Sequence, residues 1–91
     1  MKITWTNKAL SDVERLYEFL VPKNKTIAIQ TMQTLIAAPK RLLNNPRIGK
    51  KLEEFAPREV RRILVGNYEM RYEIRKTTIY ILRLWHTKEN R

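Results

Sequence analysis

The side chains best suited to chemistry lie in the last third of the chain, where arginines recur and the only histidine, His86, follows them. An unperturbed imidazole has a pKa of about 6.5, so His86 can act as an acid or a base at neutral pH. An arginine fork can bind a phosphate or a carboxylate through two parallel hydrogen bonds. A small sheet that presents such cations together predicts an anionic partner.

Arg83 is the most distinctive of these cations because it interrupts an apolar run from Thr78 to Trp85. We expect the partner-binding residues to be the cations of the sheet and tail: Arg58, Arg61, Arg62, Arg71, Arg75, Arg83 and Lys88. The alternative is a solvated charged face in which Glu69 and Glu73 pair across strands, for about 0.2 to 1 kcal/mol each. With one histidine and no cysteine, we expect neither a metal site nor a cofactor.

Three short strands are expected to position these side chains. Residues 68–75 alternate between apolar and charged side chains, which indicates a half-buried antiparallel strand. Gly66-Asn67 predicts a two-residue turn from a strand at Arg58–Val65. Lys76-Thr77 predicts a second tight turn into a strand at Thr78–Trp85. The three strands form a meander.

Before this meander, the pattern predicts a first strand and two helices. Lys2–Trp5 is the strand, and Thr6 is a suitable N-cap for a helix that ends near Leu20. A second helix is expected from about Asn24 to Leu43, kinked or locally broken at Pro39 because proline lacks an N–H. Its apolar stripe is Ala28, Met32, Leu35, Pro39 and Leu42. Arg47–Lys51 is expected to be a basic loop.

The predicted fold class is therefore α+β, with the order β-α-α-β-β-β and a helical hairpin packed on one face of a small antiparallel sheet. Residues 1–91 are expected to form one domain, which at this size buries only about 60 to 65% of its unfolded surface. A lone enzyme with a deep pocket is not expected of such a core. No signal peptide or membrane-spanning run is evident, so the predicted location is cytoplasmic.

The formal charge of the chain is +10. Residues 1–22 balance to zero, whereas residues 23–57 and residues 58–91 each carry +5. A field of this sign attracts nucleic acid or an acidic protein, and charge alone does not choose between them.

Several segments together resemble a known family. Ala9-Leu10-Ser11-Asp12-Val13 follows a tryptophan-containing first strand, and Val65-Gly66-Asn67-Tyr68-Glu69-Met70-Arg71-Tyr72 follows the helices. Ile81-Leu82-Arg83-Leu84-Trp85-His86 then completes the pattern. In this order, these segments resemble the RelE/ParE superfamily of toxins from type II toxin-antitoxin systems, along essentially the whole chain.

The resemblance implies one of two activities. ParE-like members inhibit DNA gyrase and replication, whereas RelE-like members are metal-independent endoribonucleases that cut mRNA on the ribosome. In the second case His86, Arg83 and Arg71 would be the catalytic residues. RelE and its relative YoeB have an arginine where this chain has Glu69, and the terminal tyrosine of several RelE-like nucleases is absent. These departures favour the ParE-like activity, without enzymatic function.

The resemblance also implies partners. A cognate antitoxin with an acidic C-terminal segment is expected to neutralise the toxin by wrapping the helical hairpin and the sheet. DNA gyrase is the expected target, with the ribosome and mRNA as the alternative. No membrane partner is expected.

Overall fold

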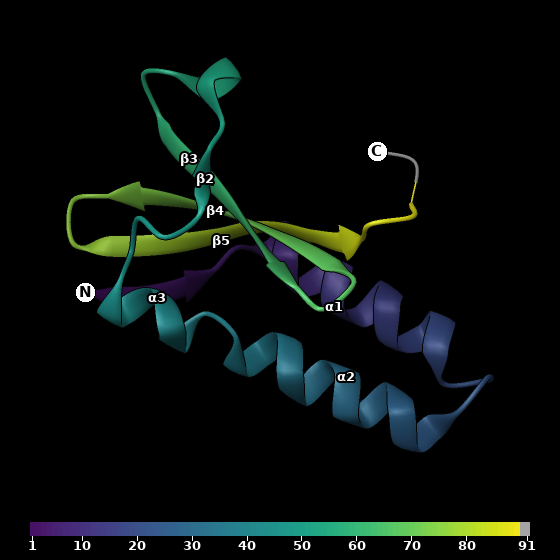
Figure 1. The fold of residues 1–91 in the computed structure, drawn as a ribbon. Helices are drawn as coiled ribbons and strands as arrows, with labels where there is room; N and C mark the ends of the chain where they lie inside the picture. The colour runs from purple at the N-terminus through teal and green to yellow at the C-terminus, as the bar shows by residue number, and fades with distance from the viewer. Residues whose placement is uncertain (90–91) are drawn as a thin grey trace.

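The computed structural model describes residues 1–89 of the 91-residue chain (Figure 1). Asn90 and Arg91 lie outside the described residues. The elements are β1 (Lys2–Trp5), α1 (Asn7–Leu20), α2 (Lys25–Ala37), α3 (Lys40–Asn44), β2 (Lys50–Lys51), the 3-10 turn η1 (Glu53–Phe55), β3 (Glu59–Val65), β4 (Tyr68–Arg75) and β5 (Thr78–His86). The predicted α+β class and element order are confirmed.

One five-stranded sheet has the strand order β1-β5-β4-β3-β2. The predicted meander is confirmed, since β3, β4 and β5 pair antiparallel. β1 pairs with β5 in parallel, from Lys2 opposite Thr78 to Trp5 opposite Ile81. Sequence alone did not predict this pairing, because a strand's pattern does not name its neighbour. The helices and the first strands of the meander form the long connection that a parallel pair requires.

The expected basic loop at Arg47–Lys51 is only partly a loop. Lys50 and Lys51 form β2 and pair antiparallel with Arg62 and Arg61 of β3. The prediction was wrong here because a two-residue strand is too short to show an alternating pattern.

Both predicted tight turns are present. Val65 pairs with Tyr68 across Gly66-Asn67, and Gly66 has a φ of 59°. Arg75 pairs with Thr78 across Lys76-Thr77, where Lys76 has a φ of 52°. The left-handed backbone at Gly66 carries no Cβ penalty because glycine has no side chain.

The helices begin and break where local chemistry predicts. The side chain of Thr6 accepts a hydrogen bond from the Ala9 N–H at 3.2 Å, and that of Asn24 accepts one from Ile27 at 3.0 Å. Pro39 separates α2 from α3. Pro39 and the other members of the predicted stripe, Ala28, Met32, Leu35 and Leu42, are buried.

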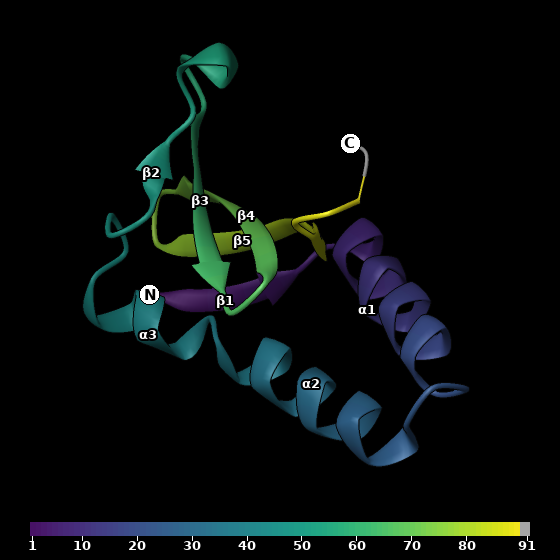
Figure 2. The same ribbon diagram turned by 45° about the vertical axis from the view of Figure 1, so that its right-hand side comes forward.

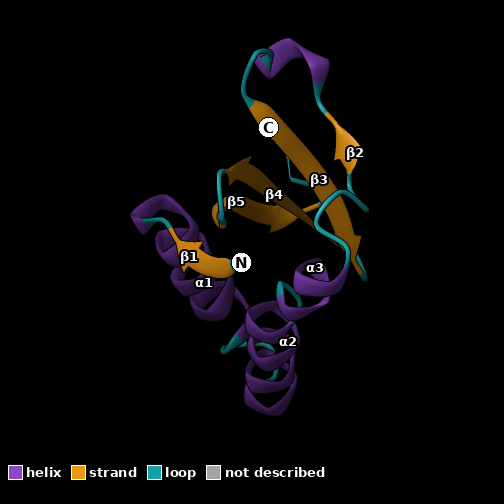
Figure 3. Ribbon diagram, turned by 90° about the vertical axis from the view of Figure 1, so that its left-hand side faces the viewer, coloured by secondary structure: helices purple, strands orange, loops and turns teal. Residues whose placement is uncertain are grey.

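Figures 2 and 3 show α1, α2 and α3 gathered on one side of the sheet, with the η1 segment projecting away from them. Apolar side chains of α1 and α2 meet the inward side chains of β3, β4 and β5 in the main core, which includes Leu16, Leu35, Met70, Tyr72 and Ile81. The other face of the sheet carries most of the predicted binding cations.

Candidate functional site

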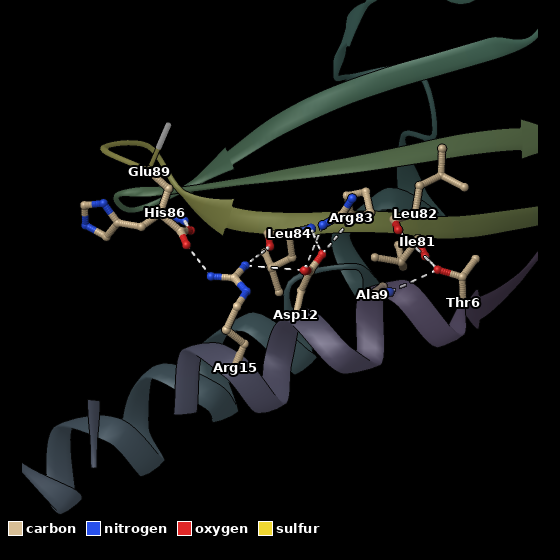
Figure 4. A network of polar contacts seen from close by, with 10 residues as sticks. All are labelled: Thr6, Ala9, Asp12, Arg15, Ile81, Leu82, Arg83, Leu84, His86 and Glu89. Carbon is tan, nitrogen blue, oxygen red and sulfur yellow. Dashed lines mark hydrogen bonds and ion pairs between the residues drawn. The ribbon is translucent and has the colours of Figure 1, made fainter. Parts of the chain in front are cut away.

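The free edge of β5 is bound by polar side chains of α1 (Figure 4). β1 ends at Trp5, so β5 beyond Ile81 has no strand on that side. The Thr6 hydroxyl donates to the Ile81 carbonyl at 2.8 Å, and Arg15 donates to the Leu84 carbonyl at 3.3 Å. An unpaired strand edge is an exposed template for association, and α1 removes part of that edge.

Asp12 is the centre of this contact. Its carboxylate accepts the Leu84 backbone N–H at 2.9 Å and two bonds from Arg83, from Nε at 2.8 Å and Nη2 at 3.1 Å. Arg15 adds a fourth donor at 3.3 Å. Burial raises the pKa of Asp12, but the bonds from Arg83 and Leu84 and the charge of Arg83 outweigh it, so the pKa lies below its usual value. Asp12 is therefore ionised at neutral pH.

Arg83 thus binds a carboxylate within its own chain. Sequence reasoning recognised that its fork suits a carboxylate or a phosphate, but missed Asp12. One sequence signal could have indicated this ion pair. Asp12 lies among the apolar positions of α1, beside Ala9, Val13 and Leu16, and Arg83 likewise lies within an apolar strand. Two charges at apolar positions are expected to pair, because a buried charge needs a partner.

His86 lies at the end of β5, where the tail folds back. Its backbone N–H donates to the Glu89 carboxylate at 2.6 Å, and its Nδ1 accepts the Lys88 N–H at 3.1 Å. The imidazole meets the Tyr68 ring edge-on, with centroids 5.1 Å apart. Arg15 forms an ion pair with Glu89. Lys88 and His86 line a groove of about 580 Å³ with apolar residues of α1, among them Phe19.

The sheet face opposite the helices, which we call the open face, carries a second group of cations. Arg71 lies 4.8 Å from the Trp85 ring and 5.7 Å from the Phe55 ring, and its Nε donates to Glu69 at 3.1 Å. Arg62 also reaches Glu69, at 3.4 Å. Arginine stacked on aromatic rings gains a cation–π attraction. Arg71 therefore fastens the projecting η1 segment to the sheet.

Glu73 forms the second acidic centre of the open face. Arg58 donates to it through Nε at 3.1 Å and Nη2 at 2.9 Å, and Arg75 lies 3.9 Å away. The Arg58 hydrogen bond lowers the pKa of Glu73 below its usual value, and burial opposes it only partly. Arg75 also lies 4.2 Å from the Tyr80 ring. The predicted pairing of Glu69 and Glu73 with sheet arginines is thus present.

Arg61 belongs to a different group. In the β3–β4 pairing it lies opposite the buried Tyr72. Its guanidinium donates hydrogen bonds to the Glu59 carboxylate at 3.0 Å and to the Gly49 carbonyl at 2.8 Å. The structure therefore brings Arg58, Arg62, Arg71 and Arg75 together around Glu69 and Glu73. Arg83 lies opposite Arg71 but is turned to Asp12, and Arg61 and Lys88 lie elsewhere.

The described residues contain no group of three or more His, Cys, Asp or Glu side chains placed to hold a metal. No helix among residues 1–89 is long and apolar enough to cross a membrane.

Comparison with known proteins assigns the family. The family described as "ParE toxin of type II toxin-antitoxin system, parDE" matches residues 3–91. The chain belongs to the ParE toxin family. A solved structure entitled "Chromosomal ParDE TA system from P. aeruginosa" has the same fold, with a TM-score of 0.79, 22% identity, and coverage of 94% of this chain and 95% of that one. No curated protein sequence matches the chain.

The ParE match confirms the resemblance to RelE/ParE toxins and the assignment to its ParE-like branch. This ParE chain is the toxin component of a type II toxin-antitoxin system, and such a system implies an antitoxin partner.

Proposed function

We propose that this ParE toxin inhibits DNA gyrase in the cytoplasm, without acting as an enzyme, and so arrests replication until its antitoxin neutralises it. The observation that carries the proposal is the ParE family match over residues 3–91. The antitoxin, in this proposal, contributes an acidic C-terminal segment, complementary to the net charge of +10.

The arrangement of Arg71, Arg83 and His86 supports a toxin that is not an RNA-cutting enzyme. Metal-independent cleavage requires an acid or base and cations directed at one phosphate. Arg83 is bound by Asp12, and Arg71 is bound by Glu69 and stacked on Trp85. Figure 4 shows the His86 ring directed away from Arg83. Arg71 and Arg83 lie opposite each other across β4 and β5, but each is held by a carboxylate of its own, and His86 lies farther along β5.

The open face is the surface that we assign to gyrase. It combines four arginines with two carboxylates, so it keeps a net positive charge after internal pairing. The Arg75 and Arg58 side chains are 60% and 53% exposed, and those of Arg62 and Arg71 are 32% and 29% exposed. The more exposed pair can reach a partner without disturbing the Arg71 stack. Arg61, Arg83 and Lys88 remain candidates outside this group of four.

The test is a supercoiling and DNA-cleavage assay with purified gyrase and purified toxin, with and without antitoxin. We expect inhibition of supercoiling that antitoxin reverses. An Arg75→Glu variant should weaken inhibition, whereas Lys8→Glu, an exposed cation on α1, is the matched control. No effect on gyrase at toxin concentrations that stop growth would refute the proposal.

Mapping of mRNA ends in cells that express the toxin alone decides the alternative. New ends inside translated messages would indicate RNA cleavage. His86→Ala should then slow cleavage by about 100-fold or more, the usual size of a general acid–base contribution.

A further inference from the structure

Residues 87–89 fold back from the end of β5 against the turn before β4 and against α1. The Thr87 N–H donates to the Asn67 carbonyl at 2.8 Å, and the Glu89 N–H donates to the His86 carbonyl at 2.9 Å. The Lys88 N–H donates to His86 Nδ1 at 3.1 Å. We call residues 87–89 the tail strap. Each of its three backbone N–H groups has an acceptor, so hydrogen bonds fix its path.

One carboxylate fastens the tail strap to α1. Glu89 forms an ion pair with Arg15 through one oxygen, and its other oxygen accepts the His86 backbone N–H at 2.6 Å. Figure 4 shows the Glu89 carboxylate facing the Arg15 guanidinium. The side chains of Arg15 and Glu89 are 37% and 30% exposed, so water and salt reach the pair. We call this ion pair the latch.

Arg15 is the fixed half of the latch. Its guanidinium also donates to the Asp12 carboxylate and to the Leu84 carbonyl, each at 3.3 Å. Asp12 lies on α1 and Leu84 lies on β5, so neither acceptor belongs to the tail strap. Arg15 therefore keeps two acceptors when the strap is detached, and it stays in place to bind Glu89 again.

The tail strap forms part of the wall of the groove of about 580 Å³ beside α1. Lys88 and Glu89 line this groove from the strap, and Leu16 and Phe19 line it from α1. Phe19 is 61% exposed. The contacts that hold the strap are hydrogen bonds and an ion pair, and the Thr87 and Lys88 side chains are exposed. A segment held by exposed polar contacts opens at a lower cost than a core strand.

From these observations we infer that the tail strap is a gate of this groove and that the latch sets its two states. In the closed state Glu89 is bound to Arg15, and the strap restricts access to the groove. In the open state the latch is broken, the strap leaves α1, and the apolar surface around Phe19 is accessible. Opening also moves Lys88, a predicted partner-binding residue, away from α1. The inference goes beyond the proposed function and does not depend on gyrase as the target.

Amide hydrogen exchange, measured by NMR on the whole chain, tests the latch. Glu89→Ala should speed exchange of the Thr87 and Lys88 N–H groups by about 10-fold, because it removes charge-assisted contacts that hold the strap closed. Exchange of the interior amides of β5 should stay unchanged. Glu18→Ala is the matched control, because Glu18 is an exposed acid on α1. It should change the two rates by less than about 2-fold.

Binding of anilinonaphthalenesulfonate tests access to the groove, because this dye combines an aromatic body with one negative charge. If only the open state binds, the apparent affinity should rise in Glu89→Ala by about the same 10-fold as the exchange rates. Adding Phe19→Ala should remove this gain, whereas adding Ile36→Ala should keep it. Ile36 is the matched control because it is 55% exposed on α2 and does not line the groove.

The unsubstituted chain offers a second measurement. Raising the salt concentration from about 0.1 M to about 1 M screens a partly exposed ion pair, so exchange at Thr87 and Lys88 should become faster in the wild type and stay constant in Glu89→Ala. Two results would overturn the inference. Unchanged exchange at these amides in Glu89→Ala would show that the latch does not hold the strap. Faster exchange without tighter dye binding would show that the strap does not control the groove.

Discussion

Replacement of Asp12 by alanine tests the contact that joins α1 to the free edge of β5. The variant removes a carboxylate whose side chain is 5% exposed and leaves the Leu84 N–H and the Arg83 fork without their acceptor. Loss of one partner of a fully buried ion pair costs about 3 to 5 kcal/mol. The Arg83 side chain is 35% exposed and can regain water, which reduces that cost. The unpaired Leu84 N–H adds about 1 to 3 kcal/mol.

We therefore expect Asp12→Ala to lower the free energy of unfolding by about 2 to 4 kcal/mol, from a total of roughly 5 to 14 kcal/mol for a chain of this length. The melting temperature should fall by at least about 8 °C. Urea unfolding followed by far-ultraviolet circular dichroism measures the first quantity, and a thermal scan measures the second.

Glu14→Ala is the control, because Glu14 is an exposed acid on the same helix. It should change stability by less than about 0.5 kcal/mol. In a double-mutant cycle, Asp12→Ala and Arg83→Ala together should cost at least about 1 kcal/mol less than the sum of the single changes. A loss for Asp12→Ala that matches Glu14→Ala, or strict additivity in the cycle, would show that the pair does not hold α1 to the sheet.

Two further predictions concern a glycine contact and acid stability. In Gly49→Ala the new Cβ would lie 2.6 Å from the Tyr72 hydroxyl and 2.7 Å from the Arg62 carbonyl oxygen, so urea unfolding should show a loss of about 1 to 3 kcal/mol. Gly66→Ala is the comparison: its φ is +59° with no atom within 4 Å, so the loss should be about 1 kcal/mol, and a larger loss at Gly66 than at Gly49 would contradict the packing argument. The folded-state pKa values of Asp12 and Glu73 lie below their ordinary values of 3.8 and 4.5, so their stabilisation is complete above about pH 5 and is lost as the pH falls through the folded-state values. The urea midpoint should be constant from about pH 7 to 5 and decline below about pH 4, and a midpoint that rises in acid would refute this assignment.

The local structure of this protein could be predicted from the sequence because its signals are themselves local. The alternation along residues 68–75 places Met70 and Tyr72 in the core and Arg71 on the open face. Thr6 as an N-cap and Pro39 as a break follow from hydrogen bonding within one turn of the helix. The family resemblance also rests on motif order along the chain, which needs no knowledge of packing.

The contacts of the candidate site were decided by tertiary structure. Asp12 and Arg83 are 71 residues apart, and they meet only because β1 joins β5 in parallel and places α1 beside the remaining edge. The stack of Arg71 on Phe55 depends in the same way on the path of the η1 segment.

The sequence by itself thus determined the elements, their order, the cations they carry and the ParE-like family. Only the tertiary structure decided which cations are held by carboxylates of the chain, as Arg83 is by Asp12, and which remain more exposed, as Arg75 does on the open face. The physical reason is that periodicity and capping act between neighbours along the chain. Ion pairing depends instead on which distant surfaces meet when the core forms.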